Sequence, residues 1–213
     1  MVSIIGFLFL CLSIITNLFV VFANIINFFK LSHNKIIFIS RFATIFILLS
    51  FLSLIFAYII SDFSNYNVFQ NSHSSKPILY KISGAWGNHE GSMLMWITIM
   101  SIYSFIFSFV KRIDESLKFK TIFFQSILFI LFSFYLVFVS NPFLANNVKV
   151  SDGLGLNPVL QDPALAIHPP ALYLGYIGYS LIFSFAIAGI VEKKINNEWF
   201  RVLKNWSLFC WSM

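Results

Sequence analysis

Five long apolar runs without a charged side chain constrain this sequence more than any other feature. They cover roughly Val2 to Phe29, Phe42 to Ile60, Ser92 to Val110, Thr121 to Ser140 and Ala171 to Val191. A helix needs about 20 apolar residues to cross the hydrocarbon core of a bilayer. The sequence therefore predicts an all-α integral membrane protein, a multi-spanning bundle with five transmembrane helices.

Composition agrees, since 59% of the residues are hydrophobic and 10% are charged, against roughly 25% charged in soluble domains. No Lys or Arg precedes the first run, which is too long for a signal peptide, so we expect a retained helix. The last segment, Trp206 to Met213, opens another apolar stretch that is too short to cross a bilayer. We therefore expect residues 1–213 to form a single membrane domain with an incomplete sixth helix, continued by a missing segment or by a partner polypeptide.

The basic residues indicate which loops share a side of the membrane. The 14 Lys and Arg residues divide 11 to 3 between alternate loops, and the two long loops, 61–91 and 141–170, hold the three. The first set is Lys30, Lys35, Arg41, Lys111, Arg112, Lys118, Lys120, Lys193, Lys194, Arg201 and Lys204, and the second is Lys76, Lys81 and Lys149. The positive-inside rule places the amino terminus and both long loops on the outer side, in the periplasm or the intermembrane space. Topology thus explains the net charge of +6 without nucleic acid as a partner.

All 22 charged side chains lie outside the five runs, which argues against a pump or antiporter with buried ionisable groups. Candidate chemistry therefore lies in the outer loops, which contain His73, His89 and His168, whereas His33 lies with the inner cations.

The segment from Asn157 to Pro170 is typical of two successive helix starts. Asp162 is placed to cap a helix that begins at Pro163, and Pro169 and Pro170 are placed to open the fifth span after His168. An imidazole held beside the positive end of that helix can bind a metal or haem iron while the helix end faces an anionic group such as a propionate. The alternative is a histidine that caps the junction by bonding to backbone, which the local sequence favours because no second ligand has metal spacing to it.

The segment from Gly84 to Ser92 is dense in glycine and polar residues, directly before the third span. It offers the imidazole of His89, a carboxylate and two amide or hydroxyl groups, which suits a binding loop. The alternative is a tight turn in which Trp86 and Trp96 are interfacial anchors. Elsewhere, Cys11 and Cys210 form no C-x-x-C pair and no nucleotide or hydrolase motif occurs, and Gly175 and Gly178 indicate close helix packing.

The two outer segments together resemble the CcmF family, the haem lyase of the cytochrome c maturation system. The matching motifs are Trp86-Gly-Asn-His-Glu-Gly-Ser92 and Asn157-Pro-x-Leu-Gln-Asp-Pro-x-Leu-Ala-x-His-Pro-Pro-x-Leu-Tyr-x-Gly-Tyr176. The resemblance covers the amino-terminal part of the family and ends before its tryptophan-rich W-W-D segment.

The resemblance implies that the chain helps to take haem from the chaperone CcmE and attach it to apocytochrome c. It implies that His168 is an axial ligand of the haem iron, and this favours the ligand over the cap. His89 and Trp86 are further candidates for haem binding, and the resemblance assigns His89 no definite role. Its second outer histidine and the W-W-D segment lie beyond Met213, so we expect this chain alone to be inactive and to need that remaining part as a partner.

The expected location is a mitochondrial or bacterial inner membrane, in contact with membrane lipid. A split mitochondrial gene is one explanation of the missing part. The competing reading is a transport or respiratory-complex membrane subunit that binds no haem.

Overall fold

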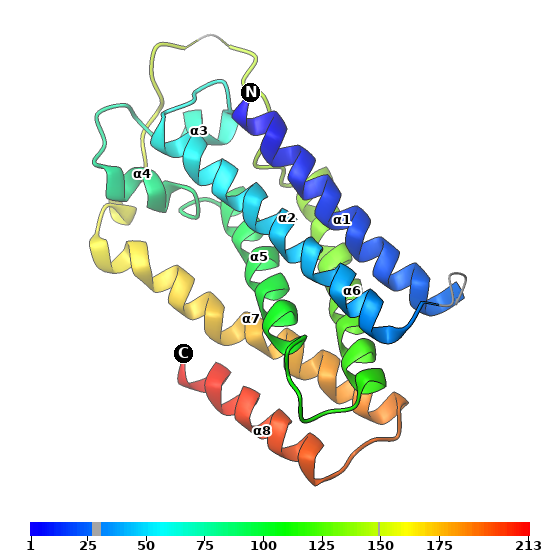
Figure 1. Cartoon of the computed structure of the whole chain (residues 1–213). Helices are drawn as coiled ribbons and strands as arrows, with labels where there is room; N and C mark the ends of the chain where they lie inside the picture. Colours follow the sequence, from blue (N-terminus) through cyan, green and yellow to red (C-terminus); the bar gives the residue numbers. More distant parts are fainter. Residues whose placement is uncertain (27–30, 149) are drawn as a thin grey trace.

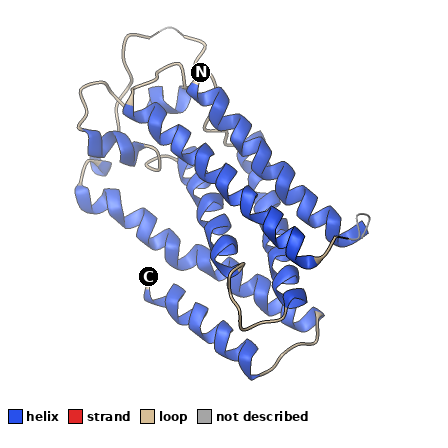
Figure 2. Cartoon of the chain, viewed as in Figure 1, coloured by secondary structure: helices blue, strands red, loops and turns tan. Residues whose placement is uncertain are grey.

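Helices form the regular structure of residues 1–26, 31–148 and 150–213, which the computed structural model describes. In chain order they are α1 (Val2–Ile26), α2 (His33–Ile59), α3 (Tyr66–Asn71), α4 (Ile78–Gly84), α5 (His89–Phe107), α6 (Glu115–Phe138), the 3₁₀ turn η1 (Pro158–Leu160), α7 (Pro163–Val191) and α8 (Asn197–Ser212). Five of them, α1, α2, α5, α6 and α7, are long and apolar enough to cross a membrane. This confirms the predicted helical membrane bundle (Figure 2).

Four of the membrane helices, α2, α5, α6 and α7, begin earlier in the sequence than the charge-free runs from which they were predicted. α2 begins at His33 rather than near Phe42, so Lys35 and Arg41 lie in the helix and not in a loop. The Arg41 guanidinium lies 4.0 Å from the centre of the Phe109 ring, and long cationic side chains commonly bury their stems while the charge reaches the membrane surface. A search for uncharged runs therefore finds the apolar part of a helix and misses an amino-terminal end that carries polar or charged residues. The predicted end of the first run, Phe29, together with Lys30 and Lys149, lies outside the described residues.

The two ends of the bundle differ in what they carry (Figure 1). The amino terminus, α3, α4 and the long connection between α6 and α7 lie at one end, which we call the loop end. The end of α1, the start of α2 and the short turns that join α5 to α6 and α7 to α8 lie at the other end. His73, His89 and His168 thus share the loop end and His33 lies opposite, as the cation pattern predicts. The His33 ring stacks on Phe119 with a centroid separation of 4.6 Å.

The interior of the bundle is held by neutral polar contacts as well as by apolar packing. Gln125 of α6 donates from Nε2 to the Ser180 hydroxyl at 2.8 Å, and its Oε1 accepts from the Ser184 hydroxyl at 2.8 Å. These bonds join α6 to α7 where no water is available to satisfy an amide. Every buried polar side chain among the described residues is neutral, so these contacts do not require a buried charge.

The incomplete apolar segment at the end of the chain is the second half of α8, a 16-residue helix that lies alongside α7 (Figure 1). Gly178 of α7 permits this approach, because a Cβ at that position would collide with the Cys210 sulfur and lie 2.9 Å from the Tyr103 ring. The expected role of Gly178 in close helix packing is therefore confirmed.

The two long loops fold against each other at the loop end rather than extending separately. Backbone hydrogen bonds connect them at four places: Tyr66 N–H to Leu144 C=O, Asn146 N–H to Ser64 C=O, Leu154 N–H to Phe69 C=O, and Gly155 N–H to Ser72 C=O. These bonds make one layer from segments that lie far apart in the sequence.

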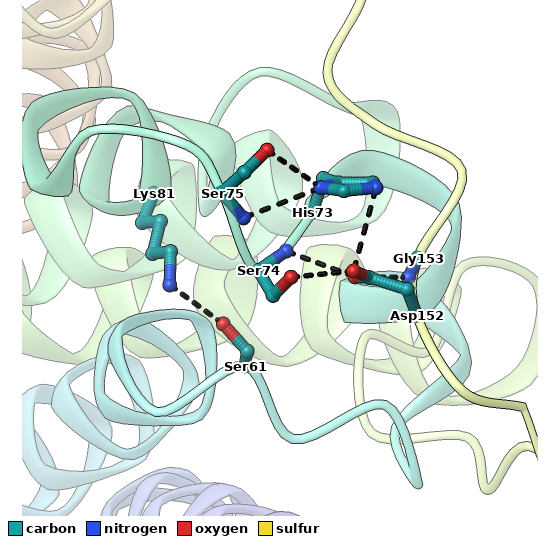
Figure 3. A network of polar contacts seen from close by, with 7 residues as sticks. All are labelled: Ser61, His73, Ser74, Ser75, Lys81, Asp152 and Gly153. Atoms are coloured by element: carbon teal, nitrogen blue, oxygen red, sulfur yellow. Dashed lines mark hydrogen bonds and ion pairs between the residues drawn. The ribbon is translucent and has the colours of Figure 1, made fainter.

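Asp152 closes this layer by binding the segment that carries His73 (Figure 3). Its carboxylate accepts hydrogen bonds from the Ser74 backbone N–H at 2.9 Å and from the Ser74 hydroxyl, and it lies 3.4 Å from His73 Nε2. The Ser75 backbone N–H donates to His73 Nδ1 at 3.2 Å, and this contact leaves Nε2 facing the Asp152 carboxylate. We call this set of contacts the Asp152 clasp.

The Asp152 clasp should open in acid. The Ser74 hydroxyl bond, with the backbone N–H groups of Ser74 and Gly153 and the nearby His73, lowers the pKa of Asp152 from 3.8 to about 2. Because the pKa is lower in the folded state, the contribution of the carboxylate is complete above about pH 4. It is lost as the pH falls through 2. We expect hydrogen-exchange protection of the Ser74 and Gly153 amides to fall between pH 4 and pH 2.

Asp152→Asn should remove this pH dependence and lower the protection at pH 7, whereas Glu198→Gln, which alters a half-buried carboxylate of α8 that pairs with Arg201, should change neither. Protection of Ser74 and Gly153 that is constant from pH 7 to pH 2 would contradict the role of the carboxylate.

Candidate functional site

A cavity of about 410 Å³ opens at the loop end, between the start of α5 and the start of α7. Its lining comes from both outer loops and consists of Ser83, Trp86, Gly87, Asn88, His89, Ser92, Leu160, Ala166, Pro169 and Tyr173. Two of the three site residues singled out in the sequence, Trp86 and His89, thus lie in one cavity. The third, His168, is adjacent to Pro169 but is not part of the lining. His73 belongs to the Asp152 clasp instead.

Asn88 caps the start of α5 and lines this cavity. Its side-chain oxygen accepts from the Gly91 N–H at 2.8 Å, as a helix N-cap does. The same side chain donates to the Tyr58 hydroxyl at 3.0 Å and accepts from the Asn67 amide at 2.8 Å. Tyr58 is fully buried, so the cap is joined to a buried polar network of α2 and α3.

Gly91 is required by the tightness of the loop. A Cβ at this position would collide with the Ala85 carbonyl oxygen, so the first turn of α5 packs directly on the backbone before Trp86. The Ser92 hydroxyl donates to the Trp86 carbonyl at 2.6 Å. The motif from Trp86 to Ser92 is therefore a rigid cap that folds back on itself, with His89 and Trp86 on its cavity side.

His89 is the first residue of α5, and one of its ring nitrogens is held by a distant part of the chain. Nδ1 lies 2.6 Å from the Ser140 hydroxyl, and the ring contacts the edge of Tyr135 with a centroid separation of 6.1 Å. A hydrogen bond to one nitrogen fixes the ring orientation and leaves the other nitrogen available, which is the usual arrangement of a metal-binding histidine.

The predicted second helix start at Pro169 is wrong. α7 is continuous from Pro163 to Val191, with Pro169 and Pro170 inside it. The first predicted start is confirmed, because α7 begins at Pro163 and Asp162 Oδ1 accepts from the Ala164 N–H at 2.7 Å. Proline inside a helix removes one backbone donor and leaves the carbonyl four residues earlier without its partner.

The structure supplies a replacement for one of these donors. Pro170 leaves the carbonyl of Ala166 free, and the indole Nε1–H of Trp86 donates to it at 2.9 Å. Neighbouring side chains commonly satisfy backbone groups that proline frees within membrane helices. This contact explains how the helix continues where the local sequence predicted a break.

His168 projects from the second turn of α7 and is exposed. Among the described residues it has no hydrogen bond or ion pair, so the bond that the junction-cap alternative requires is not formed. The expected position beside a free helix end is also wrong, because the helix starts at Pro163 and its first N–H groups are capped by Asp162. The ring is a free imidazole next to the cavity rather than a backbone cap.

Sequence reasoning missed two contributors to the site. Tyr173 lines the cavity and contacts Trp96 at a centroid distance of 5.9 Å. Ser140 holds His89 but lies 51 positions away, and no local pattern marks such a partner. Within the described residues no three His, Cys, Asp or Glu side chains converge on a bare metal site.

Comparison with known proteins gives a match that includes both halves of the cavity. Residues 86–213 match the family described as cytochrome C assembly protein, which covers both motifs. The chain belongs to this family. The resemblance to CcmF is thereby confirmed, and the reading as an unrelated transport or respiratory subunit is not favoured.

Members of the cytochrome c assembly family are similar over most of this chain. CycK of Rhizobium meliloti (strain 1021), a cytochrome c-type biogenesis protein, is 48% identical over 164 residues, which cover 76% of this chain and 24% of CycK. CcmF of Escherichia coli (strain K12) is 36% identical over 165 residues, 76% of this chain and 25% of that protein. The chain thus spans about a quarter of the length of these relatives.

The fold is shared with a solved cytochrome c haem lyase CcmF. The two superpose with a TM-score of 0.83 at 20% identity, over 99% of this chain and 34% of the other. At this identity the likeness shows that the two chains share a common fold.

Asn88→Ala should weaken the whole loop end. The change removes the N-cap of α5, worth about 0.5–2 kcal/mol, and leaves the Asn67 amide and Tyr58 hydroxyl each with one partner fewer. We expect a loss of about 2–3 kcal/mol and a melting temperature several degrees lower in detergent, measured by intrinsic tryptophan fluorescence. Asn205→Ala removes an exposed amide of α8 and is the control. Equal melting temperatures of the two variants would exclude this role of Asn88.

Proposed function

We propose that this chain is a haem-handling subunit of a cytochrome c maturation system that helps to attach haem to apocytochrome c. The observation that carries the proposal is the free imidazole of His168, which adjoins an aromatic-lined cavity. The residues of this site come from the two motifs that resemble the CcmF family. His168 is the proposed axial ligand of the haem iron.

The residues at the loop end fit haem as a cargo. Trp86 and Tyr173 offer aromatic faces in the cavity, and Leu160 and Pro169 add apolar surface, which suits a flat porphyrin ring. Asn88 and His89 provide polar groups at the same opening. When bound, haem supplies the iron to be ligated and the vinyl groups that accept cysteine thiols.

The chain's own residues have separate proposed tasks. His168 contributes a neutral nitrogen to the iron, and its exposure leaves that nitrogen accessible from outside the bundle. His89, oriented by Ser140, is a second candidate for haem binding, and Trp86 is a candidate for ring contact within the cavity. We assign no catalytic acid or base to this chain.

The proposed partners are CcmE as the source of haem, apocytochrome c as the acceptor, and the remaining part of the haem lyase that carries the W-W-D segment. The shared fold covers 34% of the solved haem lyase chain, which supports a larger assembly. Beside α8, a groove of about 320 Å³ lined by Tyr103, Ile106, Asn205, Trp206 and Phe209 offers apolar surface for helices of that remaining part.

We further propose a bacterial or mitochondrial inner membrane as the location, with the loop end in the periplasm or the intermembrane space. The division of the cations between the two ends supports this orientation. Membrane lipid is then the partner of the exposed apolar residues of the five spans.

His168→Ala should remove haem from the outer site without disturbing the fold. The side chain is exposed and lies within a helix, where alanine is the most favourable residue, so we expect stability to change by less than about 0.5 kcal/mol. Outer-site haem absorbance and cytochrome c maturation in the assembled complex should both be lost, and added imidazole should restore them in part by filling the vacant position.

Alanine is a better replacement for His168 than glycine, because glycine within a helix lowers stability by about 1 kcal/mol. His73→Ala is the matched control for another loop-end histidine and should keep its haem. Full haem occupancy in His168→Ala would show that the ligand assignment is wrong.

The chain should be inactive alone and should co-purify with the rest of the haem lyase. Phe209→Ser, in the groove beside α8, should reduce this co-purification several-fold because it places a polar group in an apolar contact. Leu52→Ser alters another exposed apolar residue, on α2, and should not reduce the co-purification. A purified chain that matures cytochrome c unaided would exclude the need for a partner.

A further inference from the structure

The carbonyl of Ala166 depends on a donor from outside its own helix. Pro170, four residues later, has no N–H to offer, and Ala166 is 4% exposed, so water is not a ready substitute. The Trp86 indole N–H supplies the bond at 2.9 Å. The cavity loop thus completes the backbone hydrogen bonding of α7.

Trp86 is itself fixed by contacts that do not involve α7. Its backbone N–H donates to the Ser83 carbonyl at 3.1 Å, and its carbonyl accepts from the Ser92 hydroxyl at 2.6 Å. Its ring packs against Phe51 of α2 with a centroid separation of 6.5 Å. The bond to Ala166 therefore ties the first turns of α7 to the body of the bundle.

His168 lies on the turn that this bond holds, two residues after Ala166. The neighbouring side chains of Pro163, Ala164 and Ile167 are exposed, and the ring of His168 has no partner of its own among the described residues. Few other contacts on this turn are therefore available to set the direction of the imidazole. Ala166 is the buried residue through which the turn is bonded to the rest of the bundle.

We propose that Trp86 is a positioning residue for His168, acting through the Ala166 carbonyl that Pro170 leaves free. The indole N–H holds the second turn of α7 in place. This helical turn then holds the His168 imidazole in one orientation beside the cavity. The consequence for haem rests on the proposed function, whereas the consequence for α7 does not.

A double-mutant cycle in the assembled haem-lyase complex tests the structural step. Trp86→Phe keeps an aromatic ring and removes the donor, and Pro170→Ala restores a backbone N–H to the Ala166 carbonyl. Hydrogen exchange of α7 between residues 164 and 174 should quicken about tenfold in Trp86→Phe. In the Pro170→Ala background the same change should have an effect of less than about twofold, because the carbonyl then has its helical partner.

Trp96→Phe is the matched control for ring packing, because the Trp96 ring also contacts α7, through Tyr173, while its indole N–H has no hydrogen-bond partner among the described residues. It should change the exchange of residues 164–174 by less than about twofold. An equal effect of Trp86→Phe in both backgrounds would show that the ring acts by packing and would overturn the proposal. Unchanged exchange in the single variant would also overturn it.

The reduction potential and absorption spectrum of the outer haem test the second step. Trp86→Phe should shift both, and Pro170→Ala combined with Trp86→Phe should return them toward the parent values. Faster exchange with an unaltered haem potential and spectrum would overturn the positioning of His168. If His168→Ala retains its haem, the proposed function fails, while the exchange cycle still measures the contact between Trp86 and Ala166.

Discussion

A bilayer offers no water to backbone N–H and C=O groups, so each helix that crosses it must satisfy them internally or through a neighbour. The loop end of this bundle depends on that constraint, because two prolines interrupt the hydrogen bonding of α7 near the membrane surface. The hydrogen bond from the Trp86 indole satisfies the Ala166 carbonyl, which one of these prolines leaves without a partner. It allows a helix of 29 residues to continue through a sequence that elsewhere would end it, and it brings the two family motifs together.

The same need for satisfied polar groups organises the layer beneath the cavity. Asn88 caps α5 and binds Tyr58 and Asn67, so the loop that carries Trp86 and His89 is anchored to α2 and α3. Within the spans, Gln125 plays the corresponding part between α6 and α7. All of these groups are neutral, which lets a membrane protein gain specific contacts without the large cost of burying a charge.

The arrangement of the candidate site follows from these anchors. His89 faces a cavity whose walls are fixed by α4, α5 and α7, whereas His168 lies on the exposed side of the tied turn next to it. These two imidazoles have different surroundings. His89 is oriented by Ser140, whereas His168 is exposed and has no hydrogen-bond partner among the described residues. Haem is the proposed cargo of this surface, and the chain spans about a quarter of the length of its relatives CycK and CcmF.

The sequence alone determined the helical membrane class, the five spans, the grouping of three histidines at one end and the Asp162 start of α7, because hydrophobic length, charge distribution and capping are local properties. It also marked Trp86, His89 and His168 through their motifs. The tertiary structure decided the rest. The helix continues through Pro169 and Pro170 because a donor arrives from Trp86, 80 positions away from Ala166, and His89 is oriented by Ser140 across 51 positions. Contacts between such distant residues leave no periodicity in the sequence, so only the packed bundle shows which backbone groups are satisfied and which imidazole remains free.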